Sequence, residues 1–244
     1  MTDLLSDRQK DLLRAIIEFY VKTGEPVGSE NIEKSYNLGV SPATIRNEMV
    51  HLTQSGYLKQ PHTSAGRVPT SMGYRLYIQE LMKEKELPIS AEVAIRENLW
   101  QQRFHENRLL KEAVRALASR IQVPALAINE EGEVFYAGTA YMLDWPEFED
   151  IDVTRFVLSL FDEFPTLQQI IGQAVGSSPM HILFGDELGF EHLEPTSFVF
   201  CKFHGKGDKE GVVGVIGPAR LNFPVVLPYV RYTSHLIEEA LRSY

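Results

Sequence analysis

The sequence of 244 residues contains one cysteine, Cys201, so no disulfide can form within a single chain. No apolar run approaches the ~20 residues that a membrane-spanning helix requires. The N-terminus also lacks a cationic segment followed by an apolar stretch, which argues against a secretory signal. With 44% hydrophobic and 23% charged residues, we expect a globular protein of the cytoplasm that does not enter a membrane.

Cations are scarce, since 24 Lys and Arg residues face 33 Asp and Glu residues and leave a net charge of -9. This balance argues against a whole surface that binds nucleic acid. The shortage is uneven, because the first 83 residues carry ten cations and nine anions. Residues 41–75 contain one anion, Glu48, and four cations, namely Arg46, Lys59, Arg67 and Arg75. This weakly basic patch suggests an N-terminal module that meets a polyanion.

Helical spacing and capping residues predict three short helices near the N-terminus. The first is expected over 7–22, behind a capping box of Ser6 and Gln9. The second is expected to begin at Ser29 as N-cap. The third should have Ser41 as N-cap and Pro42 at its first position, and should end at Gly56.

Two short strands, over 57–61 and 67–69, are expected to flank a polar tip as a β-hairpin. A fourth helix should follow from about Ser71. Three short helices followed by a hairpin form the order of a winged helix-turn-helix domain. This domain is expected over residues 1–85.

A single helix of about 48 Å is expected over Ser90–Ile121, within a connecting and dimerisation segment at 86–122. Its expected apolar stripe consists of Trp100, Phe104, Leu110, Val114, Leu117 and Ile121. Residues 123–244 should form a small α/β sensor domain, so the fold class is α+β. Its expected strands are Ala125–Asn129, Glu133–Gly138, Met180–Phe184, Ser197–Phe203 and Gly211–Ile216. Its expected helices are Asp152–Phe164, Pro165–Ala174 and Phe223–Arg242.

The third helix has the residue types of a helix that reads the DNA major groove. Ile45, Met49 and Leu52 share one face and should point to the core. Asn and Gln can pair with adenine and Arg with guanine or phosphate, and small apolar side chains can contact a thymine methyl group. The DNA-binding candidates on this helix are Ser41, Ala43, Thr44, Arg46, Asn47, Val50, His51 and Gln54. The candidates on the hairpin are Lys59, His62, Thr63, Ser64 and Arg67, of which Arg67 is expected to reach phosphate or a minor groove.

Catalytic and metal-binding patterns are weak. Cys201 and His204 have C-x-x-H spacing, but no second cysteine completes a zinc site. The G-x-x-G-x-x-G spacing that ends at Gly217 differs from the dinucleotide fingerprint. The acidic groups at 130–133 and 147–152 are interpreted as solvated surface. We therefore expect no enzyme, no metal and no cofactor.

Several segments resemble the heat-inducible transcription repressor family, HrcA. The run from Gly56 to Tyr77, GYLKQPHTSAGRVPTSMGYRLY, is very similar to that family's wing and following helix. Further similar segments are SPATIRNEM from Ser41, FYAGT from Phe135 and GVIGPAR from Gly214. The resemblance implies a GAF-like C-terminal domain and a homodimer. It also implies repression of heat-shock chaperone genes through an inverted-repeat operator in double-stranded DNA, with a chaperonin partner that keeps the repressor active.

The chain departs from the family pattern by being short. One turn connects Ala125–Asn129 to the segment that begins at Val134, where family members carry an inserted dimerisation domain. The family's Thr-Arg-Met is here Ala219-Arg220-Leu221. The operator, the effector and the dimer interface therefore stay open. Two alternatives also stay open: a winged-helix repressor gated by a small ligand, and an interaction adaptor that does not bind DNA.

Overall fold

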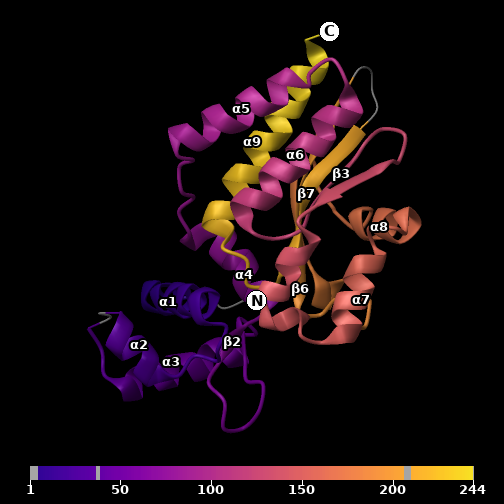
Figure 1. Cartoon of the computed structure of the whole chain (residues 1–244). Coiled ribbons are helices and arrows are strands. Elements are labelled where there is room, and N and C mark those ends of the chain that lie inside the picture. The colour runs from indigo at the N-terminus through magenta and orange to yellow at the C-terminus, as the bar shows by residue number, and fades with distance from the viewer. Residues whose placement is uncertain (1–4, 37–38, 206–209, 244) are drawn as a thin grey trace. The chain divides into compact units, whose positions relative to one another are not determined.

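The computed structural model describes residues 5–36, 39–205 and 210–243. The chain divides into two compact units, Met1–Lys83 and Glu84–Tyr244 (Figure 1). No helix among the described residues is long and apolar enough to cross a membrane.

The first unit contains helices and one small sheet. Its elements are α1 (Asp7–Thr23), α2 (Ser29–Ser35), α3 (Pro42–Gln54), β1 (Leu58–Lys59), β2 (Val68–Pro69), α4 (Ser71–Leu76) and a π-helical turn at Tyr77–Leu81. β1 and β2 pair antiparallel, as expected for the hairpin. The core is built from apolar faces of the helices and hairpin, including Leu12, Leu13, Ile16, Ile17, Ile32, Ile45, Leu52 and Leu58. This arrangement confirms the winged helix-turn-helix prediction.

Local capping explains where these helices begin. Ser6 Oγ accepts the Gln9 N–H at 3.3 Å and Gln9 Oε1 accepts the Ser6 N–H at 2.9 Å, which completes the predicted capping box. The prediction of Ser29 as the N-cap of α2 is wrong by one residue. Gly28 is the N-cap, because Asn31 Oδ1 accepts the Gly28 N–H at 2.9 Å and closes the turn around it.

The second unit combines an antiparallel sheet with helices. Its strands are β3 (Ala125–Ile128), β4 (Val134–Ala137), β5 (Met180–Phe184), β6 (Thr196–His204) and β7 (Glu210–Pro218), in the order β4-β3-β7-β6-β5. Its α-helices are α5 (Ile89–Gln101), α6 (Glu106–Ile121), α7 (Ile151–Ser159), α8 (Phe164–Ile171) and α9 (Phe223–Arg242). Short 3₁₀ helices at Thr139–Asp144, Pro146–Phe148 and Gly185–Glu187 were not predicted. The expected strands and the α+β class are confirmed.

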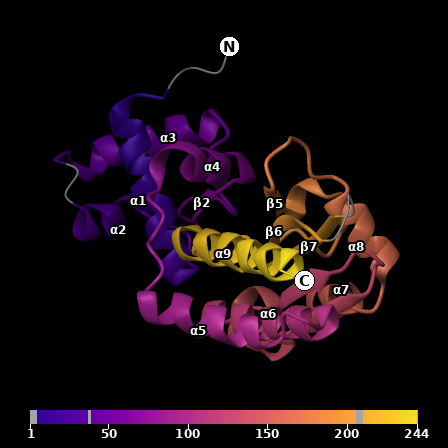
Figure 2. The same cartoon turned by 90° about the horizontal axis from the view of Figure 1, so that it is seen from above.

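Helices cover both faces of this sheet. α6 and α9 pack on one face, whereas α7 and α8 pack on the other (Figures 1 and 2). Leu126 and Ile128 of β3 belong to the core under α7 and α8. Ala125 and Ala127, which alternate with them, are fully buried on the opposite face. Most of the side chains of β3, β6 and β7 are buried, which accounts for the apolar runs in the sequence.

The single helix expected over Ser90–Ile121 is wrong, because α5 and α6 are separate helices. Leu99 is the last buried apolar residue of α5, and the positions three and four residues further on are Gln102 and Arg103. The buried stripe therefore stops, and the chain turns so that both helices pack against α9. Trp100 and Phe104, expected in the stripe, are 38% and 57% exposed.

Candidate nucleic-acid interface

Helix α3 separates a buried face from a polar exposed face. Ile45, Met49 and Leu52 are at most 4% exposed, as expected for the core side. The candidates on the other side are exposed, namely Ala43, Arg46, Asn47, Val50, His51 and Gln54. The helix therefore presents most of its predicted DNA-binding side chains on one continuous surface.

Three polar side chains of this surface have no partner in the part of the chain that the structure describes. Among the described residues, Arg46, Asn47 and Gln54 have no side-chain hydrogen bond or ion-pair partner. A guanidinium and two carboxamides without intramolecular partners can pair with base edges at no cost in internal hydrogen bonds. The exposed surface of α3 thus has donors and acceptors suited to the floor of a major groove.

Glu48, the one anion of the basic patch, faces inward and not toward this surface. Its side chain accepts hydrogen bonds from Arg8 Nε at 3.1 Å and from Gln9 Nε2 at 2.9 Å. Burial raises the pKa of Glu48, but the hydrogen bonds from Arg8 and Gln9 outweigh burial and lower the pKa overall. The carboxylate is therefore neutralised by α1, and the exposed side of α3 carries no anion.

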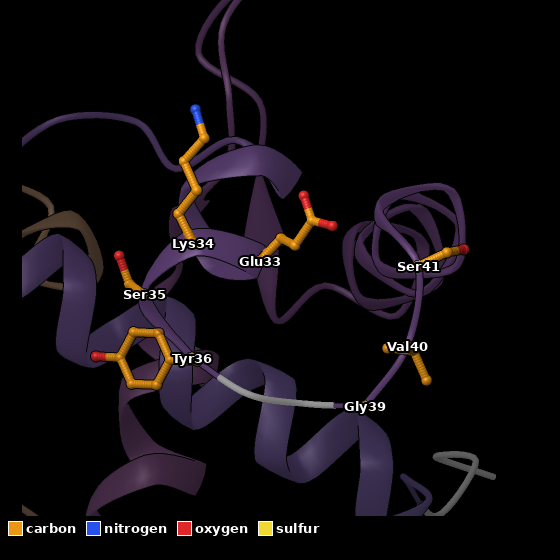
Figure 3. A pocket seen from close by; sticks show the side chains of 7 residues that line it. All are labelled: Glu33, Lys34, Ser35, Tyr36, Gly39, Val40 and Ser41. Carbon is orange, nitrogen blue, oxygen red and sulfur yellow. The ribbon is translucent and has the colours of Figure 1, made fainter.

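Ser41 and Thr44 hold the start of α3. Ser41 Oγ accepts the Thr44 N–H at 3.3 Å and lies 3.1 Å from Thr44 Oγ1. A hollow of about 610 Å³ lies beside this helix start, and Figure 3 shows Glu33 and Ser41 on its two sides. Because the Ser41 hydroxyl already serves as the helix cap, its main role here is to fix the orientation of α3.

The tip of the hairpin, which we call the wing (residues 60–67), is organised by Gln60. Gln60 Nε2 donates to the carbonyl oxygens of Thr63 and Ala65, each at 2.9 Å. His62 Nδ1 lies 3.1 Å from Ser64 Oγ. The candidates His62, Thr63 and Ser64 are exposed on this loop, and Lys59 is exposed at the end of β1 just before it. Sequence reasoning missed Gln60, because its two partners are carbonyl groups that no residue pattern reveals.

Arg67 differs from the other wing candidates because its side chain turns toward α3. Arg67 Nε donates to Thr53 Oγ1 at 2.9 Å, and Thr53 Oγ1 donates to the Met49 carbonyl at 2.7 Å. The Arg67 backbone pairs with Val27 through two hydrogen bonds of 2.9 Å. A Cβ atom on Gly66 would lie 2.5 Å from the Val27 carbonyl, so only glycine permits this close approach. Arg67 therefore ties the base of the wing to α3 and to the turn before α2.

A hollow of about 640 Å³ lies between the beginning of α2, the exposed side of α3 and the wing. Arg46 and Val50 line it from α3, and Thr63 and Ser64 line it from the wing. Residues from both groups of candidates thus surround one concave surface. Sequence reasoning had assigned them to the same function without predicting that they share a hollow.

The residues considered for metal binding do not form a site. Cys201 is buried, and burial raises the pKa of its thiol to about 11, so it stays protonated at neutral pH. Among the described residues, no group of three or more His, Cys, Asp or Glu side chains is placed to hold a metal ion.

Family comparisons match both units. Residues 4–83 match the model of the "Winged helix-turn-helix transcription repressor, HrcA DNA-binding" domain, and residues 70–227 match that of the "HrcA protein C terminal domain". The chain belongs to the HrcA family. Its first unit is therefore the family's DNA-binding domain, and the family is one of transcription repressors and not of enzymes.

Curated HrcA relatives match along their whole length. The heat-inducible transcription repressor HrcA of Symbiobacterium thermophilum is 28% identical over 337 residues, which cover 96% of this chain and 98% of the relative. That of Clostridium perfringens strain 13 is 27% identical and covers 98% of this chain and all of the relative. Because these alignments are longer than 244 residues, some positions of the relatives have no counterpart in this HrcA-family chain.

A solved structure shares the fold. A crystal structure described as that of a hypothetical protein superposes with a TM-score of 0.80 at 20% identity, and covers 98% of this chain and 99% of that chain.

Within the second unit of this HrcA-family chain, Arg220 is buried and pairs with Glu147, with its guanidinium 5.0 Å from the centre of the Trp145 ring. Arg220 thus fastens the turn after β7 to the 3₁₀ segment at Pro146–Phe148.

Proposed function

We propose that this chain represses heat-shock chaperone genes by binding an inverted-repeat operator as a homodimer in the cytoplasm. In this proposal α3 enters the major groove and the wing contacts the flanking backbone. Residues 1–85 bind DNA, 86–122 connect the two units and contribute to the dimer, and 123–244 form a GAF-like domain for sensing and dimerisation. Membership of a family of transcription repressors supports the regulatory role.

The observation that carries the proposal is the exposed side of α3. Arg46, Asn47 and Gln54 have no partners within the described protein, and Glu48, the one anion of α3, is withdrawn toward Arg8. Such a surface can combine base contacts with attraction to phosphate. Arg46 would supply charge, whereas Asn47 and Gln54 would discriminate between bases.

The dimer follows from the symmetry of the target. Two copies of α3 can occupy successive major grooves when their separation is about one helical turn of DNA, roughly 34 Å. An inverted repeat presents the same sequence to each copy in opposite orientations, so a two-fold dimer can contact both halves equally. A single copy would contact one half and bind more weakly.

Fluorescence anisotropy with labelled duplexes tests the proposal. One duplex carries the inverted repeat upstream of a chaperone operon of the source genome, and the other carries the same bases scrambled. We expect tighter binding to the inverted repeat and a steep loss of affinity as salt rises, because phosphate contacts release counterions. Equal, weak binding to both duplexes at low salt would contradict the proposal.

We also propose that a chaperonin modulates this binding, as the family relation suggests. Adding purified chaperonin to the operator assay should increase the fraction of duplex bound at a fixed repressor concentration. An unfolded substrate protein added next should reverse the increase by competing for the chaperonin. Unchanged binding in both steps would argue against a chaperonin partner.

A further inference from the structure

Residues 84–88 lead into α5 and form neither helix nor strand, yet they are fastened to α9 of their own unit at two points. Arg231 donates two hydrogen bonds to the Glu84 carboxylate, from Nη1 at 2.7 Å and from Nη2 at 2.9 Å. The Lys85 N–H donates to the carbonyl of Pro224, in the first turn of α9, at 2.8 Å. Figures 1 and 2 show this stretch beside the beginning of α9. We call these two attachments the linker clamp.

The ion pair of the linker clamp fixes a direction as well as a distance. A guanidinium that meets both oxygens of a carboxylate holds the two side chains in one orientation. The hydrogen bonds from Arg231 lower the pKa of the Glu84 carboxyl, so it is ionised at neutral pH. Because the two side chains are 52% and 36% exposed, the pair adds little to the stability of the unit. Its main effect is therefore on the path of the chain.

The linker clamp determines how much chain is free between the two units. Only residues 82 and 83 separate the π-helical turn at Tyr77–Leu81 from the clamp. Helix α5 is held on α9 separately, since the Tyr232 hydroxyl donates to the Glu92 carbonyl at 3.1 Å. Without the clamp, the free tether would grow from two residues to the seven of 82–88, which span about 24 Å when fully extended.

We infer that Glu84 and Arg231 are positioning residues for DNA binding, because the linker clamp keeps the tether of each DNA-binding unit short. This inference rests on the proposed function, in which two such units bind the two halves of one inverted repeat. When one unit has bound, the tether sets the effective concentration of the other unit at its half, and this concentration falls as the tether lengthens. A short tether also restricts the separations of the two halves that both units can reach. The clamp thus favours the correct spacing without touching DNA.

The ion pair of Arg96 with Glu239 provides a matched control. It joins α5 to α9 at 3.0 Å, and its side chains are 47% and 36% exposed, much like those of the linker clamp. Arg96→Ala therefore removes the same charge and a similar ion pair from the same unit as Arg231→Ala does, but it leaves residues 84–88 attached. A difference between the two variants can then be assigned to the linker.

Amide hydrogen exchange of the full chain without DNA measures the linker clamp directly. Arg231→Ala should make the Lys85 amide exchange about tenfold faster or more, because its bond to Pro224 opens more often. Arg96→Ala should leave this amide as in the wild type. Unchanged exchange in Arg231→Ala would overturn the inference.

A charge exchange separates the pair itself from a general effect of each substitution. Glu84→Arg and Arg231→Glu should each accelerate exchange of the Lys85 amide. The double variant should regain a substantial part of the protection, because the two opposite charges face each other again. A double variant that exchanges faster than either single variant would contradict the pairing.

Anisotropy with a series of duplexes tests the positioning role. The series contains the complete inverted repeat, repeats whose halves are moved apart by a few base pairs, and a duplex with a single half. Arg231→Ala should bind the single half as the wild type does, and the complete repeat roughly fivefold more weakly, because its tether is longer. It should also lose less affinity than the wild type when the halves are moved apart. Arg96→Ala should match the wild type on every duplex.

The outcomes distinguish this inference from the proposed function. A wild type that binds the complete repeat no better than a single half would contradict the proposed function, and the positioning role with it. A wild type that prefers the correct spacing, with the same preference in Arg231→Ala, would overturn the inference and leave the proposed function intact. Weaker binding of Arg231→Ala to the single half would show an effect on the DNA-binding unit itself and would also overturn the inference.

Discussion

Helix α3 and the wing use their polar side chains in opposite ways. On α3, Arg46, Asn47 and Gln54 make no side-chain bonds within the described protein. On the wing, Gln60 donates hydrogen bonds to the carbonyl groups of Thr63 and Ala65. Arg67 donates a hydrogen bond to the Thr53 hydroxyl. The exposed polar side chains of α3 are therefore available to a ligand, whereas Gln60 and Arg67 stabilise the conformation of the wing.

Under the proposed function, this difference separates residues expected to read DNA from residues expected to position others. A side chain without internal partners can distinguish bases, so its loss should change sequence preference. A side chain that is held by internal bonds sets the geometry of a loop, so its loss should weaken binding to every sequence. Arg67, expected from the sequence to reach phosphate or a minor groove, has the second kind of environment.

Asn47→Ala should have the largest effect on specificity. If Asn47 pairs with a base through two hydrogen bonds, the variant should lose about 1–3 kcal/mol of discrimination between the inverted repeat and its scrambled version. Anisotropy with both duplexes measures this difference. Asn107→Ala, on the exposed side of α6 in the other unit, is the control and should behave as wild type. Equal losses of affinity for both duplexes would show that Asn47 does not read a base.

Glu48→Gln should lower the stability of the DNA-binding unit by about 1–2 kcal/mol, because it removes the charge from the hydrogen bonds with Arg8 and Gln9. Thermal unfolding measures the change. Since folding lowers the pKa of Glu48 from about 4.5, the wild type should lose this contribution as the pH falls below that value. The stability of the variant should depend less on pH in that range, and parallel pH curves would contradict the ion pair.

Arg67→Lys should weaken binding to both duplexes by about 1 kcal/mol, because lysine keeps the charge but cannot reproduce the guanidinium bond to Thr53. Thr53→Val removes the acceptor of that bond and should cause a similar loss, although it leaves Arg67 itself in place. Anisotropy at one salt concentration compares the two. Full affinity in both variants would show that the bond between Arg67 and Thr53 does not contribute to DNA binding.

Gln60→Ala should have the smallest effect, about 0.5–1 kcal/mol on both duplexes, since the wing loses two hydrogen bonds but keeps its attachment through Arg67 and Val27. Amide hydrogen exchange of the wing should become faster, whereas exchange in α3 should stay the same. Unchanged exchange in the wing would show that Gln60 does not organise it.

Local patterns in the sequence predicted much of this molecule. The capping box of Ser6 and Gln9 and the Ser41-Pro42 start of α3 depend on neighbours within one helical turn, so their positions were correct. The strands of the second unit were recognised because buried strands are continuous apolar runs. The exposed side of α3 also followed from helical periodicity alone.

Features that depend on distant residues were missed. The inward turn of Arg67 requires pairing with Val27, forty residues earlier in the chain. The break between α5 and α6 arises from packing on α9, more than one hundred residues later. The withdrawal of Glu48 depends on Arg8 in another helix. In each case the determining contact is tertiary, and one sequence carries no signal for it.

The contrast between α3 and the wing is tested most directly by comparing Asn47→Ala with Gln60→Ala on the inverted repeat and the scrambled duplex at one salt concentration. The ratio of the two affinities is the quantity to measure. We predict that Asn47→Ala lowers this ratio, whereas Gln60→Ala weakens both affinities equally and leaves the ratio at its wild-type value. A ratio that falls with Gln60→Ala and not with Asn47→Ala would contradict the account.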